Sequence, residues 1–265
     1  MKSFFKSLIN LIWAKKNFKF FVKNALDFKH KNDMRKIINS LYFENHVRPI
    51  HLKIPENKKI LVIAPHPDDE TLGCGGLLIQ SALKNCKIHI LSLSSGLESE
   101  QQEREAELQL SANDIGVEQI TFLRLNDGNI CDEIQKENYL ANICDKFSPD
   151  IILTPFIFDH HLDHICANKL FLDSIDNVDA EIWCYQVYNN IISNAYCDIT
   201  NVIDKKTKII NNYDSQTKSF DYAHWNRGLN AWNSRLCLSK KHKFVESYFI
   251  APKKDFIDIC KQYFL

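Results

Sequence analysis

The sequence predicts an α/β fold, a three-layer sandwich in which helices cover both faces of a mostly parallel sheet. Two observations lead to this prediction. Short runs rich in Ile, Leu and Val recur along the chain, separated by segments long enough for a helix. Continuous runs of Ile, Leu and Val of this kind are expected for strands buried on both faces. Such a strand–helix rhythm is typical of a Rossmann-like arrangement with crossover helices between parallel strands.

The expected elements alternate from Lys58 onward. Each apolar run is bounded by Gly, Pro or Asp, which interrupt regular structure. The tail after Asn190 is expected to be a helical extension. In chain order we predict strands at 58–65, 87–93, 119–125, 150–156 and 181–188, with helices at 70–85, 100–115, 133–147 and 162–175.

Residues 1–57 are predicted to be an N-terminal arm and linker, and residues 58–265 the compact domain. The first 28 residues contain six Lys interleaved with Phe, Leu, Ile and Trp13. A basic amphipathic helix there would lie on an anionic membrane surface or pack on the domain, and the sequence leaves both interpretations open. The uncharged stretch from Ser7 to Ala14 is far shorter than the roughly 18 residues that a membrane span needs.

Charge and cysteine content indicate which partners and which compartment to expect. Thirty-three Lys and Arg balance 33 Asp and Glu, so no overall positive field favours nucleic acid as a partner. The nine cysteines are an odd number without a C-x-x-C pair, which does not indicate a disulfide framework. We therefore expect a reducing compartment, hence a cytoplasmic protein, with peripheral contact at the inner membrane surface if the N-terminal arm binds lipid.

The first chemical motif follows the first strand, where the chain reads Ala64-Pro65-His66-Pro67-Asp68-Asp69-Glu70 and then three glycines within four residues. Two prolines stiffen the loop that presents the imidazole. Three consecutive acidic residues are more than a helix N-terminus requires, and a metal ion would compensate them. The glycines at 73, 75 and 76 would allow something to approach the following helix closely. A simple helix cap with a turn histidine is the alternative.

The second motif follows the fourth strand and reads Asp159-His160-His161-Leu162-Asp163-His164. Ligand sites of open α/β sheets lie at the carboxyl ends of strands, so the two motifs are expected to converge. His66 and Asp69 plus one of the later histidines make a set of two imidazoles and one carboxylate, which suits a catalytic zinc. Iron or another divalent ion would also fit. Spacing alone does not choose among the three histidines.

These two motifs resemble those of the PIG-L/LmbE-like N-acetylglucosaminyl deacetylase family. The A-H-P-D-D-E-like string with its trailing glycines and the H-x-D-H string match in type and order. The resemblance covers roughly residues 58–190 and includes Arg104-Glu105 and Asp127-Gly128. Pro65, inserted between Ala64 and His66, and Leu162, which replaces a proline, depart from the pattern without removing a functional group.

The resemblance implies roles for individual residues. His66, Asp69 and His164 would bind zinc, and Asp68 would be the general base. His161, protonated and oriented by Asp163, would stabilise the oxyanion and help to protonate the leaving amine. Glu70 would support a ligand or a backbone amide rather than bind the metal, and His160 would be exposed or support the site.

Three further residues are candidates for substrate binding. Arg104 would meet sugar hydroxyls or a phosphate, or else form a salt bridge on a solvated helix. Asp127 would bind a sugar hydroxyl, or simply belong to an Asp-Gly turn. Arg227 is a weaker candidate within an aromatic-rich segment. Its neighbours Trp225 and Trp232 would stack on a sugar or, following helical spacing, pack in the core.

The leading prediction is a zinc-dependent hydrolase that removes the acetyl group from an N-acetylated amino sugar within a glycan, glycolipid or nucleotide-sugar pathway, so that the sugar is the expected partner. An amidase acting on another sugar-linked amide, such as a thiol-sugar conjugate, would keep the same metal and water. A nucleotide-binding protein is disfavoured because G-C-G-G lacks the G-x-G-x-x-G spacing. A noncatalytic scaffold is disfavoured because the expected ligands and base are all present. The sequence does not indicate the oligomeric state.

Overall fold

We describe the fold from a computed structural model, which defines residues 49–135, 137–172, 179–237 and 239–265. The basic segment 1–28, and with it the choice between a membrane surface and packing on the domain, lies outside the described residues. In the part of the chain that the structure describes, no helix is both long and apolar enough to cross a membrane.

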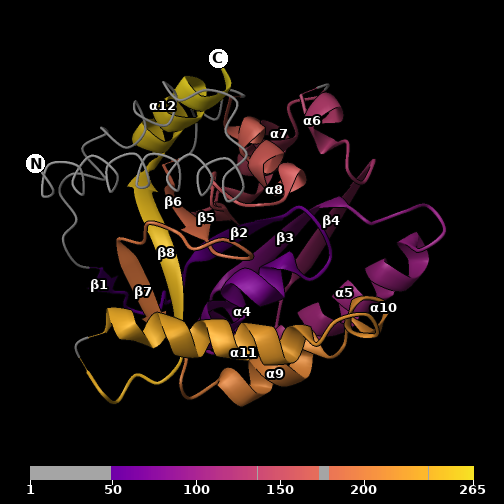
Figure 1. Cartoon of the computed structure of the whole chain (residues 1–265). Coiled ribbons are helices and arrows are strands. Elements are labelled where there is room, and N and C mark those ends of the chain that lie inside the picture. The colour runs from indigo at the N-terminus through magenta and orange to yellow at the C-terminus, as the bar shows by residue number, and fades with distance from the viewer. Residues whose placement is uncertain (1–48, 136, 173–178, 238) are drawn as a thin grey trace, which may run out of the picture.

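One sheet of eight strands forms the centre of the described region, in the order β1-β7-β8-β6-β5-β2-β3-β4 (Figure 1). Only β8 runs antiparallel to its neighbours, β6 and β7, and the remaining pairs are parallel. The prediction of a mostly parallel sheet is therefore confirmed. The strands are β1 (Ile50–His51), β2 (Lys59–Ala64), β3 (Lys87–Ser94), β4 (Gln119–Leu125), β5 (Ile151–Pro155), β6 (Glu181–Tyr185), β7 (Ala195–Asp198) and β8 (Val245–Pro252).

Helices cover both faces of the sheet, with α4, α5, α9, α10 and α11 on one side and α6, α7, α8 and α12 on the other (Figure 1). Each face has its own apolar core. Ile60 and Val62 of β2 belong to one cluster, whereas Leu61 and Ile63 belong to the other, so this strand is apolar on both faces. The helices are α4 (Asp69–Ala82), α5 (Gln101–Ile115), α6 (Ile130–Glu133), α7 (Tyr139–Phe147), α8 (Leu162–Ala167), α9 (Ile203–Ile210), α10 (Asp214–Thr217), α11 (Tyr222–Asn233) and α12 (Lys253–Phe264), with 3₁₀ turns η1 (Asn168–Leu172) and η2 (Ser234–Leu236).

The five predicted strands are all present, but one predicted helix, the tail and the linker differ from the prediction. The expected helix at 133–147 is two shorter helices, α6 and α7. The tail is only partly helical, because β7 and β8 extend the sheet. Ile50–His51, from the segment assigned to the linker, pairs with β7. Both residues of this two-residue strand are exposed, so no apolar run marked it in the sequence.

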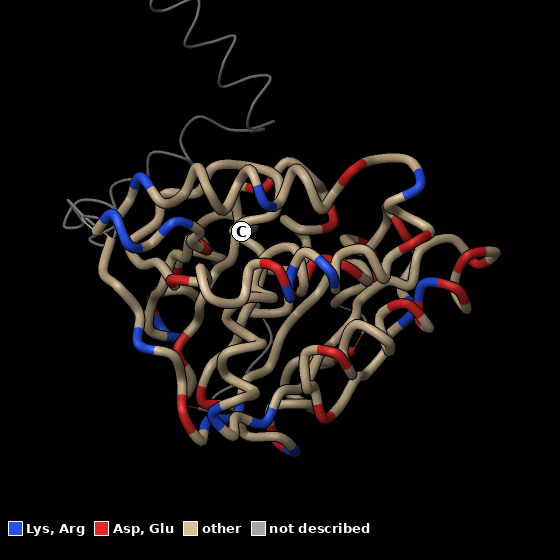
Figure 2. The backbone as a smooth tube through the Cα atoms, turned by 90° about the horizontal axis from the view of Figure 1, so that it is seen from below, with Lys and Arg blue, Asp and Glu red and all other residues tan. Residues whose placement is uncertain are grey.

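One disulfide joins Cys131 to Cys166. The cysteine spacing did not predict this pairing, which links the segment after β4 to α8 across 35 residues. The other seven cysteines are free, and six of them are buried among apolar residues as expected. Lys and Arg positions are interspersed with Asp and Glu along the backbone (Figure 2), which agrees with the balanced charge of the chain.

Candidate active site

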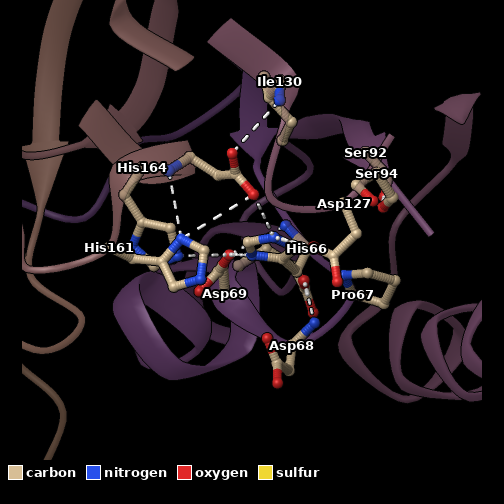
Figure 3. A network of polar contacts seen from close by, with 12 residues as sticks. His66, Pro67, Asp68, Asp69, Ser92, Ser94, Asp127, Ile130, His161 and His164 are labelled. Atoms are coloured by element: carbon tan, nitrogen blue, oxygen red, sulfur yellow. Dashed lines mark hydrogen bonds and ion pairs between the residues drawn. The ribbon is translucent and has the colours of Figure 1, made fainter. Parts of the chain in front are cut away.

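The two motifs converge at the carboxyl edge of the sheet. β2 and β5 pair in parallel, so the loops that follow them begin side by side. The loop after β2 presents His66 and leads into α4, and the loop after β5 leads into α8. Figure 3 shows the imidazoles of His66, His161 and His164 gathered around Asp69. The predicted convergence is therefore present in the structure.

Asp69 is the buried carboxylate shared by the two motifs. Its Oδ2 accepts a hydrogen bond from the backbone N–H of His66 at 2.9 Å and lies 3.3 Å from His66 Nδ1. The same oxygen lies 3.1 Å from His164 Nε2. Burial alone would raise the pKa of Asp69, but the adjacent His164 and His66 outweigh it and hold that pKa well below its ordinary value.

His164 lies between two carboxylates. Its Nδ1 is 3.2 Å from Asp159 Oδ1, and its Nε2 faces Asp69. Burial lowers the pKa of His164, but the charges of Asp69 and Asp159 outweigh it and raise that pKa to about 9. Both ring nitrogens are buried, yet neither contact is aligned as a hydrogen bond. In its neutral form, His164 would have a buried ring nitrogen able to bind a cation.

His161 and Asp163 are both present, but they interact differently from the expectation. The Asp163 carboxylate is 4.0 Å from His161 Nδ1, too far for a hydrogen bond. Instead, the backbone N–H of Asp163 donates to His161 Nδ1 at 3.2 Å. Burial, together with the charges of His164 and His66, lowers the pKa of His161. The structure therefore favours a neutral His161 whose Nε2 carries the proton.

The Asp163 carboxylate is turned toward the segment after β4. It accepts hydrogen bonds from the backbone N–H groups of Gly128 at 2.8 Å and Ile130 at 3.3 Å, and it lies 3.3 Å from His66 Nε2. Asp127 reaches the same histidine, with its Oδ1 2.9 Å from His66 Nε2. Asp127, expected to meet a sugar hydroxyl, thus lies within the imidazole cluster, and its contact with His66 lowers its pKa.

Asp68 lies beside the cluster, with its side chain buried. Burial and the charge of Asp69 raise the pKa of Asp68 well above its ordinary value. Glu70 accepts a hydrogen bond from the backbone N–H of Asp68 at 3.2 Å, which is the supporting contact expected of it. Arg104 is buried rather than solvated, donates to the Pro67 carbonyl at 3.3 Å and places its charge near Asp68.

Two other residues lie away from this constellation. His160 is exposed. The guanidinium of Arg227 donates to Asp204 Oδ1 at 2.7 Å and lies over the ring of Phe244 at 4.8 Å. The structure therefore does not bring Arg227 to the cluster, because a carboxylate of α9 and an aromatic ring before β8 already hold it.

The side chains present fit a divalent cation. Two groups of three have ligand atoms within 4.8 Å of one another, His66 with His161 and His164, and His66 with Asp127 and Asp163. Asp69 contacts two members of the first group. Neutral imidazoles and carboxylates are the ligands that zinc and iron accept in catalytic sites. The undirected nitrogens of His164 are available for such an ion.

Comparison with known proteins identifies this arrangement. Residues 61–175 match the family model described as PIG-L: GlcNAc-PI de-N-acetylase. This part of the chain is similar to the PIG-L family. The match begins in β2 and extends past α8, so it contains both motifs and every element between them. The family resemblance of the sequence is therefore confirmed.

Individual known proteins are similar to this chain in sequence or in fold. Diacetylchitobiose deacetylase of Thermococcus kodakarensis is 24% identical over 233 residues, which cover 77% of this chain and 86% of the relative. The structure of N,N'-diacetylchitobiose deacetylase from Pyrococcus horikoshii has a TM-score of 0.63 at 20% identity, covering 91% of this chain and 94% of that one.

A third relative shows that this fold does not by itself decide the reaction. GalB of Pseudomonas putida, a 4-carboxy-2-hydroxymuconate hydratase, has a TM-score of 0.60 at 17% identity, covering 73% of this chain and 96% of that one. A function for this chain must therefore be argued from its side chains.

Sequence reasoning missed two residues that the structure places next to His164. Asp159 contacts His164 Nδ1, accepts the backbone N–H of His161 at 3.0 Å and accepts that of Tyr188 at 3.3 Å. Tyr188 stacks on the His164 imidazole with ring centroids 5.5 Å apart. The available signal for Asp159 was its place at the head of the histidine-rich string, since carboxylates commonly orient metal-binding histidines.

Proposed function

We propose that this protein is a metal-dependent hydrolase that removes the acetyl group from an N-acetylated amino sugar. The observation that carries the proposal is the meeting of His66, Asp69 and His164 beside the buried carboxylate of Asp68. The PIG-L match over residues 61–175 and the diacetylchitobiose deacetylase relative support an N-acetylated sugar as the substrate class. The sugar would be part of a glycan, a glycolipid or a nucleotide-sugar precursor.

His66, Asp69 and His164 would hold the metal ion. When bound there, a divalent cation such as zinc or iron supplies Lewis-acid activation of water and of the amide carbonyl. Asp159 lies 3.2 Å from the far nitrogen of His164, and Asp163 and Asp127 lie beside Nε2 of His66, where carboxylates would orient the two rings once the metal is bound. The side chains around the ligands therefore keep both imidazoles oriented before substrate arrives.

Asp68 would act as the general base. Its raised pKa makes it a stronger base than an exposed aspartate, so it takes a proton from the attacking water as the new carbon–oxygen bond forms. The neutral His161 would donate its Nε2 proton in a hydrogen bond to the developing oxyanion. When the carbon–nitrogen bond breaks, Asp68 would return the proton that it took from water to the leaving amine, and acetate would be released.

Arg104 and Asp127 are the remaining candidates for contact with the sugar. Arg104 approaches the loop that carries Asp68, and Asp127 is partly exposed beside His66. Each could hold a sugar hydroxyl at the edge of the cluster. Arg227 is left out of this assignment because of its pairing with Asp204.

The test is metal content together with acetate release from a panel of N-acetylglucosamine derivatives. The panel includes thiol-sugar amides, which would detect an amidase with a different substrate. We expect Asp68→Asn to retain the metal and to lower kcat by about 10²- to 10⁴-fold, the range for loss of a general base. His164→Ala should lose the metal and the activity together.

His160→Ala is the matched control, because this neighbouring histidine is exposed. It should keep both metal and activity. Full activity after removal of all metal by a chelator, or in Asp68→Asn, would contradict the proposal. Metal-dependent cleavage of a thiol-sugar amide without acetate release from any sugar would replace the deacetylase with the amidase.

A further inference from the structure

A fully buried ion pair lies beside α4, which packs against α9 and β8 (Figure 1). Lys206 of α9 and Glu246 of β8 are 0% and 1% exposed, and Lys206 Nζ is 2.8 Å from Glu246 Oε1. Taking two charges out of water is costly, so a buried ion pair often stabilises a fold less than apolar side chains of the same volume would. The contacts of the two charges therefore indicate what else the pair does.

Both charges bind the backbone of α4 in the interior of the helix. Glu246 accepts hydrogen bonds from the N–H groups of Gly76 at 2.7 Å and Leu77 at 2.9 Å. Lys206 donates to the Leu72 carbonyl at 2.9 Å. In a regular α-helix the Gly76 N–H would donate to that same carbonyl, four residues earlier. The ion pair therefore supplies a charged partner to each end of one backbone hydrogen bond of α4.

A glycine of the first motif makes this contact possible. A Cβ at Gly76 would lie 2.9 Å from Glu246 Oε1, which is closer than a real Cβ atom approaches another atom. The carboxylate can therefore reach the backbone of α4 only because this position lacks a side chain. Part of the glycine string that follows the acidic residues is thus explained by a charge of the protein itself.

The buried face of α11 completes this network. Asn226 donates to the Leu72 carbonyl at 2.8 Å, and Asn230 Oδ1 accepts a hydrogen bond from Lys206 Nζ at 3.1 Å. Both asparagines are buried, whereas the two tryptophans of this helix are 50% and 58% exposed. The interpretation that these tryptophans pack in the core is therefore wrong, and the face that α11 turns inward is polar.

Leu72 connects the network to the candidate active site. Its N–H donates to the Asp68 carbonyl at 2.8 Å, and its own carbonyl is the group that Lys206 and Asn226 hold. Asp69 is the first residue of α4. The first turn of this helix therefore carries the candidate base and a candidate metal ligand, and a displacement of about 1 Å in such groups can lower a rate by about 100-fold.

We propose that Lys206 and Glu246 are positioning residues, which hold the first turn of α4 and thereby keep Asp68 and Asp69 in place around the metal ion. This inference rests on the proposed function and adds to it two residues that lie outside the region matched by the PIG-L model. The pair acts through the backbone of α4 and does not touch the substrate. A merely structural pair would affect the stability of the fold alone.

The test uses Lys206→Met/Glu246→Gln, which replaces both charges with neutral side chains of similar shape. This double variant should fold, because it leaves no buried charge unpaired. We expect zinc to bind its metal-free form about 10- to 100-fold more weakly than it binds the intact protein. With zinc at saturation, kcat for the best sugar of the panel should fall by about the same factor while KM is unchanged.

Asp204→Asn is the matched control. Asp204 also lies on α9 and also forms an ion pair, with Arg227, but that pair is exposed. This variant should match the intact protein in zinc affinity and in kcat. A folded double variant with unchanged zinc affinity and unchanged kcat would overturn the positioning role, even if its stability were reduced.

Calorimetric titration with zinc separates this proposal from the proposed function, because it needs no turnover. Weaker zinc binding by the double variant, together with no acetate release by the intact protein, would remove the deacetylase and leave the positioning pair. If the double variant does not fold, Asn226→Leu decides. It removes a neutral donor to the Leu72 carbonyl, and Asn226 Oδ1 has no hydrogen-bond partner to lose. Zinc affinity should fall by about three- to tenfold, the scale of one hydrogen bond, and an unchanged affinity would overturn the proposal.

Discussion

At the scale of single residues, Asp68 is the proposed general base and also has a strained backbone. Its φ is 129°, in a region that residues with a side chain rarely occupy. The Asp68 carbonyl accepts hydrogen bonds from Thr71 at 3.0 Å and Leu72 at 2.8 Å, while its N–H donates to Glu70. Strain of this kind persists where surrounding contacts hold it, and such residues cluster at functional sites.

A substitution of Glu70 tests whether its contacts hold the backbone of Asp68 in place. Its carboxylate accepts hydrogen bonds from the Asp68 N–H, the Thr71 hydroxyl and the Tyr213 hydroxyl. In Glu70→Gln one oxygen becomes an NH₂ group that must face a donor, so Asp68 shifts. We expect kcat to fall by about 10- to 100-fold while metal content is unchanged. Tyr213→Phe removes one donor to Glu70, so kcat should fall less than in Glu70→Gln. A larger fall of kcat in Tyr213→Phe than in Glu70→Gln would count against this role of Glu70.

His89 gives the protein a predictable response to acid. The side chain is buried on β3, with Nε2 2.9 Å from the Thr121 hydroxyl and the ring against Phe147. Burial lowers the pKa of His89 from 6.5 to about 4. Because the folded-state pKa lies below the unfolded one, the unfolded state binds more protons between these two values. The stabilisation is therefore present above pH 6.5 and is lost as pH falls toward 4.

We expect His89 to contribute about 2 kcal/mol to the loss of unfolding free energy between about pH 7 and pH 5. His89→Gln, which cannot gain a proton, should reduce the pH dependence by this amount. Urea denaturation of both proteins at the two pH values measures the difference. Parallel pH profiles for the variant and the intact protein would show that His89 is not the titrating group.

At the scale of elements, α4 shows why its glycines are needed. A Cβ at Gly73 would lie 2.1 Å from Tyr185 Cδ2, and one at Gly76 would lie 2.5 Å from Ile199 Cγ2. The close approach expected from these glycines is therefore made by the protein's own side chains. Tyr185 cannot move aside easily, because it is fully buried and its hydroxyl donates to the Ile63 carbonyl at 2.7 Å.

Two glycine substitutions should have opposite effects on stability. Gly73→Ala overfills the space beside Tyr185 and should lower the free energy of unfolding by about 3 kcal/mol. Gly228 lies within α11, where an added Cβ would meet only open space, so Gly228→Ala should raise it by about 1 kcal/mol through helix propensity. Thermal or urea unfolding compares the two variants. A stable Gly73→Ala protein would mean that Tyr185 rearranges.

At the scale of the whole molecule, the Cys131–Cys166 disulfide ties two segments that build the site. Cys131 lies in α6, just after the Gly128 and Ile130 amides that bind Asp163. Cys166 lies in α8, two residues after His164. The disulfide therefore joins the segment that carries Asp127 to the helix that carries the second motif.

Removing this disulfide should destabilise the fold. A cross-link that closes a loop of 35 residues restricts the unfolded chain, and its loss should lower the free energy of unfolding by about 4 kcal/mol. The measurement is urea unfolding of the oxidised protein and of Cys131→Ser/Cys166→Ser. Cys237→Ser, at a free and less buried cysteine, should behave like the intact protein. Equal stability of the double variant and the oxidised protein would exclude this contribution.

The sequence alone determined the five strands β2 to β6 and the meeting of the two motifs. Strands buried on both faces are mostly apolar, so β2, β3 and β5 are visible as local runs rich in Ile, Leu and Val. Parallel strands place their carboxyl ends at one edge, so the loops that present His66 and His164 had to emerge together. Local composition predicts the strands, and one rule of topology predicts that the two motifs meet.

The tertiary structure decided which side chains face one another. The Asp163 carboxylate faces His66 rather than His161, Asp159 contacts His164, and Arg227 is held by Asp204. These outcomes depend on distances of a few ångströms between elements far apart in the chain, which no local pattern encodes. The same holds for β1, at one edge of the sheet, and its neighbour β7, whose places in the sheet follow from pairing rather than from their own composition.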